Sequence, residues 1–257
     1  FSRIFVLNGF AGTGKTTLIA ALVAALKELR IKPVLLAPTG RAAKVLARYC
    51  GEQALTIHKR IYRQRTNADY ESKFSLDFNR EQGAVFIVDE ASMLSDSTGD
   101  GALFGSGSLL EDLVSYVRSG RSCRLILVGD SAQLPPVGCD FSPALDPATV
   151  SRYGEVVYGL MDEVVRQQMQ SGILFNATLV RCMLENRIYE IPKFEMDYPD
   201  FESVEGGDFM EKLQDAFDRY GRDEVIVITR SNKRANRYNE GIRRYILSAE
   251  EEIESGD

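Results

Sequence analysis

The chain has 257 residues, of which 44% are hydrophobic and 26% are charged, and its formal net charge is −6. This composition is typical of a globular protein with one large or two smaller domains, and it excludes disordered and fibrous chains. It also excludes a membrane-spanning helix, since no run of 18 apolar residues is present. The four cysteines form no CxxC pair and His58 is the only histidine, so we expect no zinc site and a reduced, cytoplasmic protein.

Four short apolar runs are the predicted strands of the front part of the chain. They lie at residues 4–7, 33–37, 85–88 and 125–128. None of them alternates apolar with polar residues, which favours central strands of a parallel sheet covered on both faces. Apolar residues at helical spacing follow the first two runs. Strands that alternate with helices predict a doubly wound α/β domain.

Two segments interrupt this alternation. Residues 61–78 are polar between Tyr62 and Phe74, and we expect a β-hairpin that projects from the sheet. Residues 95–108 are rich in Ser, Gly and Asp, which is typical of a mobile loop.

The pattern weakens after Pro135 and Pro136. Helices are predicted at 164–169, 173–184, 209–220 and 232–247, an extended segment at 186–208 and a buried strand at 225–229. We therefore predict a first domain over residues 1–154, with a hairpin insertion at about 61–80. A second, partial α/β domain is predicted over residues 155–257.

A phosphate-binding motif follows the first strand. Residues 9–16 fit G-x-x-x-x-G-K-[ST] between a strand and a helix, a context that an incidental glycine-rich turn does not provide. Backbone N–H groups of such a loop surround the phosphates, while Lys15 places its charge on the β- and γ-phosphates and Thr16 binds Mg²⁺. The predicted ATP-binding residues are Gly9, Ala11, Gly12, Thr13, Gly14, Lys15, Thr16 and Thr17.

Polar residues follow two further predicted strands. Asp89 ends one apolar run and is expected to hold Mg²⁺ through water, and Glu90 to orient or deprotonate the attacking water. Gln133 lies after the run at 125–128. Because parallel strands send their carboxyl ends to one edge, we expect it to reach the γ-phosphate. A proline-stopped loop is the alternative for Gln133, and the start of a turn is the alternative for the acidic pair.

Several segments together resemble superfamily 1 DNA helicases of the RecD/Dda type. Residues 9–17, 89–93 and 129–136 resemble motifs I, II and III of that family, and residues 37–43, 56–58 and 163–167 resemble motifs Ia, Ib and IV. The resemblance implies a RecA-like P-loop NTPase domain with a parallel sheet, followed by the start of a second RecA-like domain. It also implies movement from 5′ to 3′ on single-stranded DNA.

The family resemblance assigns further roles. Arg166 would reach the γ-phosphate as an arginine finger, although an ordinary surface arginine is the alternative. Thr39, Arg41, Thr56 and His58 would lie along the DNA strand, with a structural histidine as the alternative for His58. The hairpin at 61–78 would be the pin, whose candidates to meet bases are Tyr62, Tyr70 and Phe74, and packing is their alternative.

The leading hypothesis is therefore an ATP-dependent DNA helicase motor that uses ATP and Mg²⁺. Motifs V and VI of the resembled family are not found, so we expect an N-terminal fragment with weak or no unwinding activity. Expected partners are single-stranded DNA and the subunits of a helicase–nuclease complex, and we expect a monomer. The alternatives are a P-loop hydrolase or kinase that does not act on DNA, or a binding module gated by nucleotide.

Overall fold

The computed structural model describes residues 3–66, 72–96, 104–163, 171–221 and 224–247. The chain divides into two compact units, one made of residues 1–169 with 180–190 and the other of residues 170–179 with 191–257. The predicted helix at 164–169 and part of the predicted loop at 95–108 lie outside the described residues.

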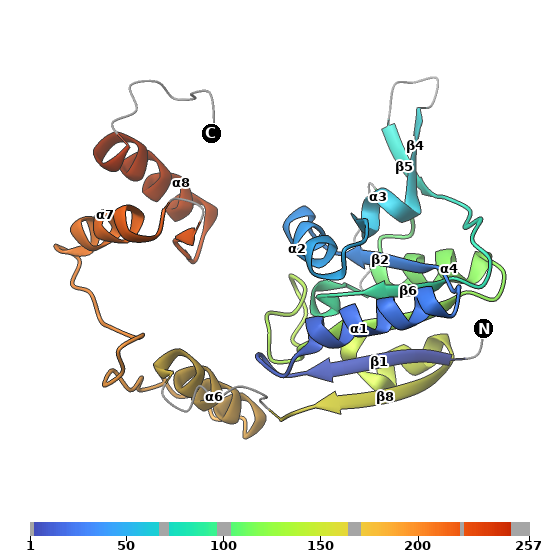
Figure 1. The fold of residues 1–257 in the computed structure, drawn as a ribbon, viewed down its shortest axis with the longest axis horizontal. Coiled ribbons are helices and arrows are strands. Elements are labelled where there is room, and N and C mark those ends of the chain that lie inside the picture. Colours follow the sequence, from blue (N-terminus) through green and yellow to red (C-terminus); the bar gives the residue numbers. More distant parts are fainter. Residues whose placement is uncertain (1–2, 67–71, 97–103, 164–170, 222–223, 248–257) are drawn as a thin grey trace. The chain divides into compact units, whose positions relative to one another are not determined.

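The first unit is built on a six-stranded sheet whose strands all pair in parallel (Figure 1). The strands are β1 (Arg3–Gly9), β2 (Pro33–Ala37), β3 (Ala54–Thr56), β6 (Val85–Val88), β7 (Arg124–Gly129) and β8 (Glu155–Met161). Their order is β3-β2-β6-β7-β1-β8. Asn8 of β1 lies opposite Gly129 of β7, so the carboxyl ends of these strands meet at one edge. The predicted parallel α/β sheet is confirmed.

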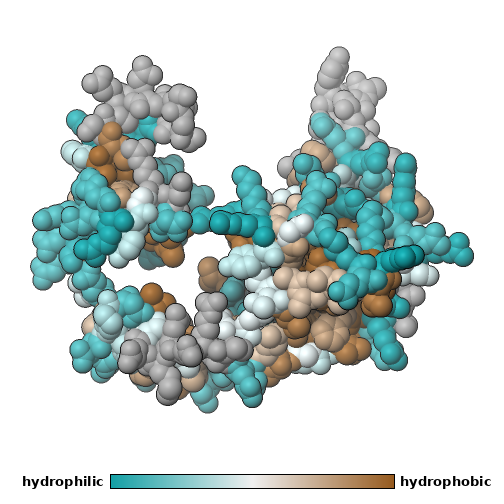
Figure 2. Space-filling view, viewed as in Figure 1, coloured by the Kyte–Doolittle hydropathy of each residue, from teal (hydrophilic) through white to brown (hydrophobic). Residues whose placement is uncertain are grey.

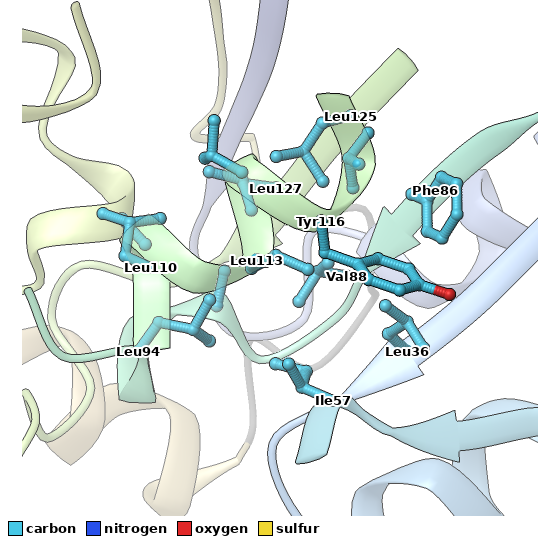
Figure 3. Packing of buried hydrophobic residues seen from close by; sticks show 14 of the residues in the cluster. Leu36, Ile57, Phe86, Val88, Leu94, Leu110, Leu113, Tyr116, Leu125 and Leu127 are labelled. Atoms are coloured by element: carbon cyan, nitrogen blue, oxygen red, sulfur yellow. The ribbon is translucent and has the colours of Figure 1, made fainter. Parts of the chain in front are cut away.

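Helices cover both faces of this sheet and create two apolar cores. The helices are α1 (Lys15–Glu28), α2 (Gly40–Cys50) and α4 (Leu109–Ser119). On one face, Ile87 of β6 packs with Ile19 and Val23 of α1. On the other face, Phe86 of β6 packs with Tyr116 of α4, with ring centroids 6.1 Å apart (Figure 3). Successive strand residues thus pack into opposite cores, which explains the continuous apolar runs of the sequence.

The polar segment at 61–78 contains the expected hairpin. Its elements are α3 (Ile57–Ile61), β4 (Tyr62–Thr66) and β5 (Ser72–Leu76). The two strands pair antiparallel from Tyr62 opposite Leu76 to Thr66 opposite Ser72. Figure 1 shows them extending away from the main sheet.

Strand β8 lies beyond the predicted domain boundary at residue 154 but belongs to the first sheet. It pairs with β1 from Glu155 opposite Arg3 to Met161 opposite Gly9, so residues 155–161 complete the first sheet and do not begin a second domain. β8 is an edge strand whose residues are half-buried or exposed. An edge strand needs fewer apolar side chains than a central one, which is why the sequence pattern did not mark it. Short helical turns precede β8 at Pro143–Leu145, Pro147–Val150 and Ser151–Tyr153, and another follows β6 at Ala91–Met93.

The second unit is helical in its described part. It contains the start of α6 (Gly172–Glu185), then α7 (Phe209–Tyr220), α8 (Asn232–Gly241) and a π-helical turn (Ile242–Ile246). The buried strand predicted at 225–229 is not formed, and Ile226 and Ile228 are 61% and 88% exposed. A strand requires a neighbour for its backbone hydrogen bonds, and the described part of this unit offers none. None of the described helices is long and apolar enough to cross a membrane.

Candidate nucleotide site

The loop between β1 and α1 has the backbone of an anion-binding turn. Gly12 and Gly14 have φ angles of 78° and 86°, in the left-handed region that favours glycine. Gly14 is the N-cap of α1, and no side chain caps this helix. The first N–H groups of α1 are therefore free of a side-chain acceptor, and together with the helix dipole they favour an anion at this position.

Lys15 lies at the mouth of this loop. Its Nζ donates hydrogen bonds to the carbonyl oxygens of Gly9, at 2.7 Å, and Phe10, at 2.8 Å. Burial lowers the pKa of the Lys15 ammonium, while the carboxylates of Asp130, Glu90 and Asp89 oppose this effect. A cation held by two neutral carbonyls in a partly buried site would be stabilised by the stronger acceptors of a phosphate group.

The acidic pair follows β6 at the same edge. Burial raises the pKa of Asp89, and it also raises the pKa of Glu90, to which the neighbouring Asp89 charge contributes. One oxygen of Asp89 accepts a hydrogen bond from the Glu90 N–H at 3.0 Å. Glu90 itself has a φ angle of 54°, a left-handed conformation that is uncommon and strained outside glycine. A carboxylate with a raised pKa is well suited to accept a proton near neutral pH.

A cavity of about 750 Å³ brings six of the eight predicted ATP-binding residues together with Glu90 and Gln133, while Gly9, Ala11 and Asp89 are not part of its lining. Its lining includes Gly12, Thr13, Gly14, Lys15, Thr16, Thr17, Glu90 and Gln133. Gln133 reaches it from the loop after β7, where its N–H donates to the Asp130 carbonyl at 3.1 Å. The structure therefore collects residues from three separated motifs in one cavity. Arg166, the predicted arginine finger, lies outside the described residues.

The two predicted Mg²⁺ ligands, Thr16 and Asp89, both carry oxygen donors, which suit a hard cation. Thr16 lies in the first turn of α1 and carries a hydroxyl, and Asp89 carries a half-buried carboxylate whose pKa is raised by burial. In the described part of the chain, no three His, Cys, Asp or Glu side chains form a metal cluster. A hydroxyl and a carboxylate are oxygen donors of the kind that Mg²⁺ takes alongside waters and phosphate oxygens.

Sequence reasoning missed a polar network beside this cavity. Asp130, 1% exposed, forms an ion pair with Arg181 of α6 at 2.6 Å. The Arg181 guanidinium also lies 4.0 Å from the centre of the Phe10 ring. The amide of Asn8 donates to the hydroxyls of Ser131, at 2.9 Å, and of a β8 tyrosine, at 3.1 Å. Asp130 was visible within its motif, but no local pattern connects Arg181 with residues far earlier in the chain.

Two of the predicted DNA-binding residues cap the helices that follow the adjacent strands β2 and β3. Thr39 is the N-cap of α2 and Thr56 is the N-cap of α3, and each hydroxyl accepts a backbone N–H at 3.2 Å. Thr56 is the last residue of β3, opposite Ala37 of the adjacent strand β2, and Thr39 lies two residues beyond Ala37. Arg41 is exposed in the first turn of α2. The two threonines therefore have an established structural role as helix caps, alongside any contact with a ligand.

His58 and the hairpin aromatics pack against one another. The His58 ring lies 5.0 Å from Phe104 and 5.6 Å from Tyr62, and burial lowers its pKa. Tyr62 is 8% exposed and donates its hydroxyl to Asp112 at 2.6 Å. Phe74 stacks on Phe104 with ring centroids 4.4 Å apart. Tyr62 is thus held in the core and does not present its ring to bases, whereas Tyr70 lies outside the described residues.

The exposed surface around α1 differs from this packed cluster. Figure 2 shows paler and brown surface over α1, surrounded by hydrophilic side chains. Leu18 of α1 is 44% exposed, and it lines the 750 Å³ cavity together with Val45 and Tyr49 of α2, which are 48% and 65% exposed. The cavity therefore has an apolar wall next to its phosphate-binding loop.

Comparisons with known proteins match the chain to a family model and to several named helicases. A family model described as an AAA domain (AAA_30) matches residues 2–173, more than half of the chain. The ATP-dependent RecD2 DNA helicase of Deinococcus radiodurans is 33% identical over 135 residues, which cover 52% of this chain and 16% of that protein. The RecBCD enzyme subunit RecD of Mycobacterium tuberculosis is 33% identical over 201 residues, covering 63% of this chain and 32% of that protein.

A further helicase and a solved helicase structure are also similar to this chain. The ATP-dependent DNA helicase dda of Enterobacteria phage T4 is 34% identical over 136 residues, covering 51% of this chain and 28% of that protein. The chain thus spans between 16% and 32% of these three relatives. The solved structure of Pif1 helicase from Candida albicans aligns with 95% of this chain and 51% of that chain, at 18% identity and a TM-score of 0.47.

The sheet order, the P-loop between β1 and α1 and the family match identify a RecA-like P-loop NTPase fold. The predicted motifs I, II and III all lie within the matched residues 2–173. The chain belongs to the AAA domain family, and it is similar in sequence to superfamily 1 helicases of the RecD/Dda type.

Proposed function

We propose that this chain hydrolyses ATP with Mg²⁺ and couples hydrolysis to 5′-to-3′ movement on single-stranded DNA. The observation that carries the proposal is the single cavity in which the uncapped start of α1 and Lys15 meet Glu90 and Gln133. A binding turn alone explains Lys15 but does not explain a half-buried carboxylate in a strained backbone conformation beside it.

Each residue has a role that follows from its position. The N–H groups of residues 12–17 and the Lys15 ammonium bind the phosphates, and Thr16 and Asp89 would hold Mg²⁺. When bound, Mg²⁺ supplies positive charge to the phosphate oxygens. Glu90 accepts a proton from the attacking water, and Gln133 orients that water or the γ-phosphate. We propose Arg166 as an additional cation at the γ-phosphate, on the basis of the motif IV resemblance alone.

The proposed DNA track follows the carboxyl edge of β2 and β3. Thr39 and Thr56 each cap a helix there, and exposed Arg41 supplies a positive charge for a phosphate. His58 is assigned a packing role, because its ring lies among aromatic side chains and burial favours its neutral form. The two Thr caps also fix where the starts of α2 and α3 present their N–H groups.

The names of the relatives support the choice of DNA as the partner. One relative is named as a RecBCD enzyme subunit, and we propose that this chain too works with subunits of a helicase–nuclease complex. A P-loop hydrolase or kinase that does not act on DNA is the competing class, as is a module that only binds nucleotide.

The deciding experiment measures phosphate release from ATP by the 257-residue chain, with and without single-stranded DNA. We expect hydrolysis that DNA stimulates and that Lys15→Ala abolishes. Lys27→Ala is the matched control, because Lys27 lies on the same helix and pairs with Glu52 at the surface. Phosphate transfer to a small molecule would support a kinase, and nucleotide binding without turnover would support the module.

A further inference from the structure

Among the ion pairs of the described residues, the pair between Arg181 and Asp130 has the least exposed carboxylate. The Arg181 Nη2 lies 2.6 Å from an Asp130 carboxylate oxygen, and the two side chains are 13% and 1% exposed. Residues 180–190 belong to the first unit, so the pair lies within one compact body. A carboxylate buried to this degree depends on its partner, because removing one charge leaves the other unpaired in a low-dielectric site.

Asp130 uses its other acceptors to shape the loop that carries Gln133. Its second carboxylate oxygen accepts the Ala132 N–H at 3.0 Å, and its carbonyl accepts the Gln133 N–H at 3.1 Å. The position of Gln133 in the cavity therefore depends on how Asp130 is held. Arg181 holds it from the opposite side.

The same guanidinium also touches the phosphate-binding loop. Its central carbon lies 4.0 Å from the centre of the Phe10 ring, within the range of a cation–π contact. The Phe10 carbonyl in turn accepts the hydrogen bond from Lys15 at 2.8 Å. One planar cation thus contacts the loops after β1 and β7, which are neighbouring strands. A lysine would match the two contacts less well, since its ammonium is a point charge without a planar face to lie over the ring while it bonds the carboxylate.

We propose that Arg181 is a positioning residue for ATP hydrolysis, which holds the Gln133 loop and the phosphate-binding loop in register through Asp130 and Phe10. The inference rests on the proposed function, because it assigns Arg181 to the same ATP site. Arg181 does not have to touch the nucleotide in this role. Its effect passes through Gln133 and Lys15, whose positions the two contacts fix.

The test compares Arg181→Gln, Arg181→Lys, Asp130→Asn and the double variant Arg181→Gln/Asp130→Asn. We expect Arg181→Gln to lower kcat for ATP by about 10- to 100-fold and to change KM much less, because misplaced catalytic groups cost turnover more than binding. Arg181→Lys should recover only part of kcat. The double variant should be no worse than the poorer single variant, which shows that both residues act through one contact.

Arg187→Gln is the matched control, since Arg187 is exposed and lies in the same unit. A purely structural pair would lower the Tm of the single variants while leaving kcat unchanged, and that result would overturn the proposal. If Arg181→Gln does not fold, the double variant carries no unpaired buried charge and decides the question: turnover equal to wild type overturns the proposal. Absence of hydrolysis by the wild-type chain would instead refute the proposed function, and with it this role.

Discussion

The carboxyl edge around β1, β6 and β7 and the base of the hairpin both contain buried polar groups. The two regions differ in how well the polar groups are satisfied by protein partners. At the hairpin base, the Tyr62 hydroxyl is bonded to Asp112, and Asp112 also accepts the Ser106 N–H at 3.0 Å. At the carboxyl edge, α1 has no side-chain cap, and burial raises the pKa values of Asp89 and Glu90. Polar groups that satisfy one another stabilise a fold, whereas uncapped N–H groups and carboxylates whose charge is costly in the folded chain indicate a site for a ligand.

The largest effect should come from Glu90→Gln. If Glu90 is the proton acceptor, we expect ATP hydrolysis to fall by about 100-fold or more while ATP binding is kept. The measurement is steady-state phosphate release together with direct titration of a fluorescent ATP analogue. Glu52→Gln, on the loop after α2, is the control and should leave both unchanged. Hydrolysis by Glu90→Gln at the wild-type rate would remove Glu90 from the mechanism.

The same variant should be more stable than the wild-type chain at neutral pH. Because the pKa of Glu90 is raised in the folded chain, its charge is unfavourable to folding above that pKa. This cost disappears as the pH falls through the folded pKa towards the unfolded one, so the gain in Tm should disappear with it. Thermal unfolding at several pH values checks this, and a lower Tm for Glu90→Gln at neutral pH would contradict a costly charge.

The hairpin base should respond in the opposite way to Tyr62→Phe. Removing the hydroxyl leaves the buried Asp112 with one hydrogen-bond donor fewer, and we expect a loss of about 1–3 kcal/mol in the free energy of unfolding. ATP hydrolysis at a temperature where the variant remains folded should not change. Tyr189→Phe is the control, because Tyr189 is 87% exposed and belongs to the same unit. An unchanged free energy of unfolding in Tyr62→Phe would show that the Asp112 contact contributes nothing.

Thr39 allows a structural role, as the cap of α2, and a DNA-binding role to be tested at one residue. Thr39→Ala removes the cap of α2 and should cost about 1 kcal/mol of stability, while Thr39→Ser keeps the accepting oxygen. If Thr39 also binds a DNA phosphate, Thr39→Ala should weaken single-stranded DNA binding and Thr39→Ser should not. Equal DNA affinity for all three proteins, measured by fluorescence anisotropy at fixed salt, would leave Thr39 with its structural role alone.

The smallest effect should be that of His58 on DNA binding. Burial lowers the pKa of His58, so its ring stays neutral at neutral pH and gives no charge to a phosphate. We expect His58→Phe to bind single-stranded DNA as the wild type does between about pH 6.5 and 8. The wild-type chain should lose stability as the pH falls below about 6.5, because the folded state resists protonation, and His58→Phe should lose less. DNA affinity that depends on His58 would return it to the proposed DNA track.

Local patterns predicted those parts of the molecule that depend on local physics. The P-loop has this property, since Gly12 and Gly14 adopt conformations that glycine favours and the helix starts at Lys15. The central strands do too, because burial on both faces requires continuous apolar runs. The edge strand β8 and the segment at 225–229 were misjudged for the same reason: apolar content alone does not tell whether a partner strand is available.

The sequence by itself determined the phosphate-binding loop, the α/β class and the resemblance to superfamily 1 helicases, because each is written in residues a few positions apart. Only the tertiary structure decided what lies beside that loop. It placed Glu90 and Gln133 in the cavity of Lys15, put Tyr62 into the core and joined Arg181 to Asp130. These contacts join residues remote in the chain, and their energies depend on burial and distance, which the order of residues does not display.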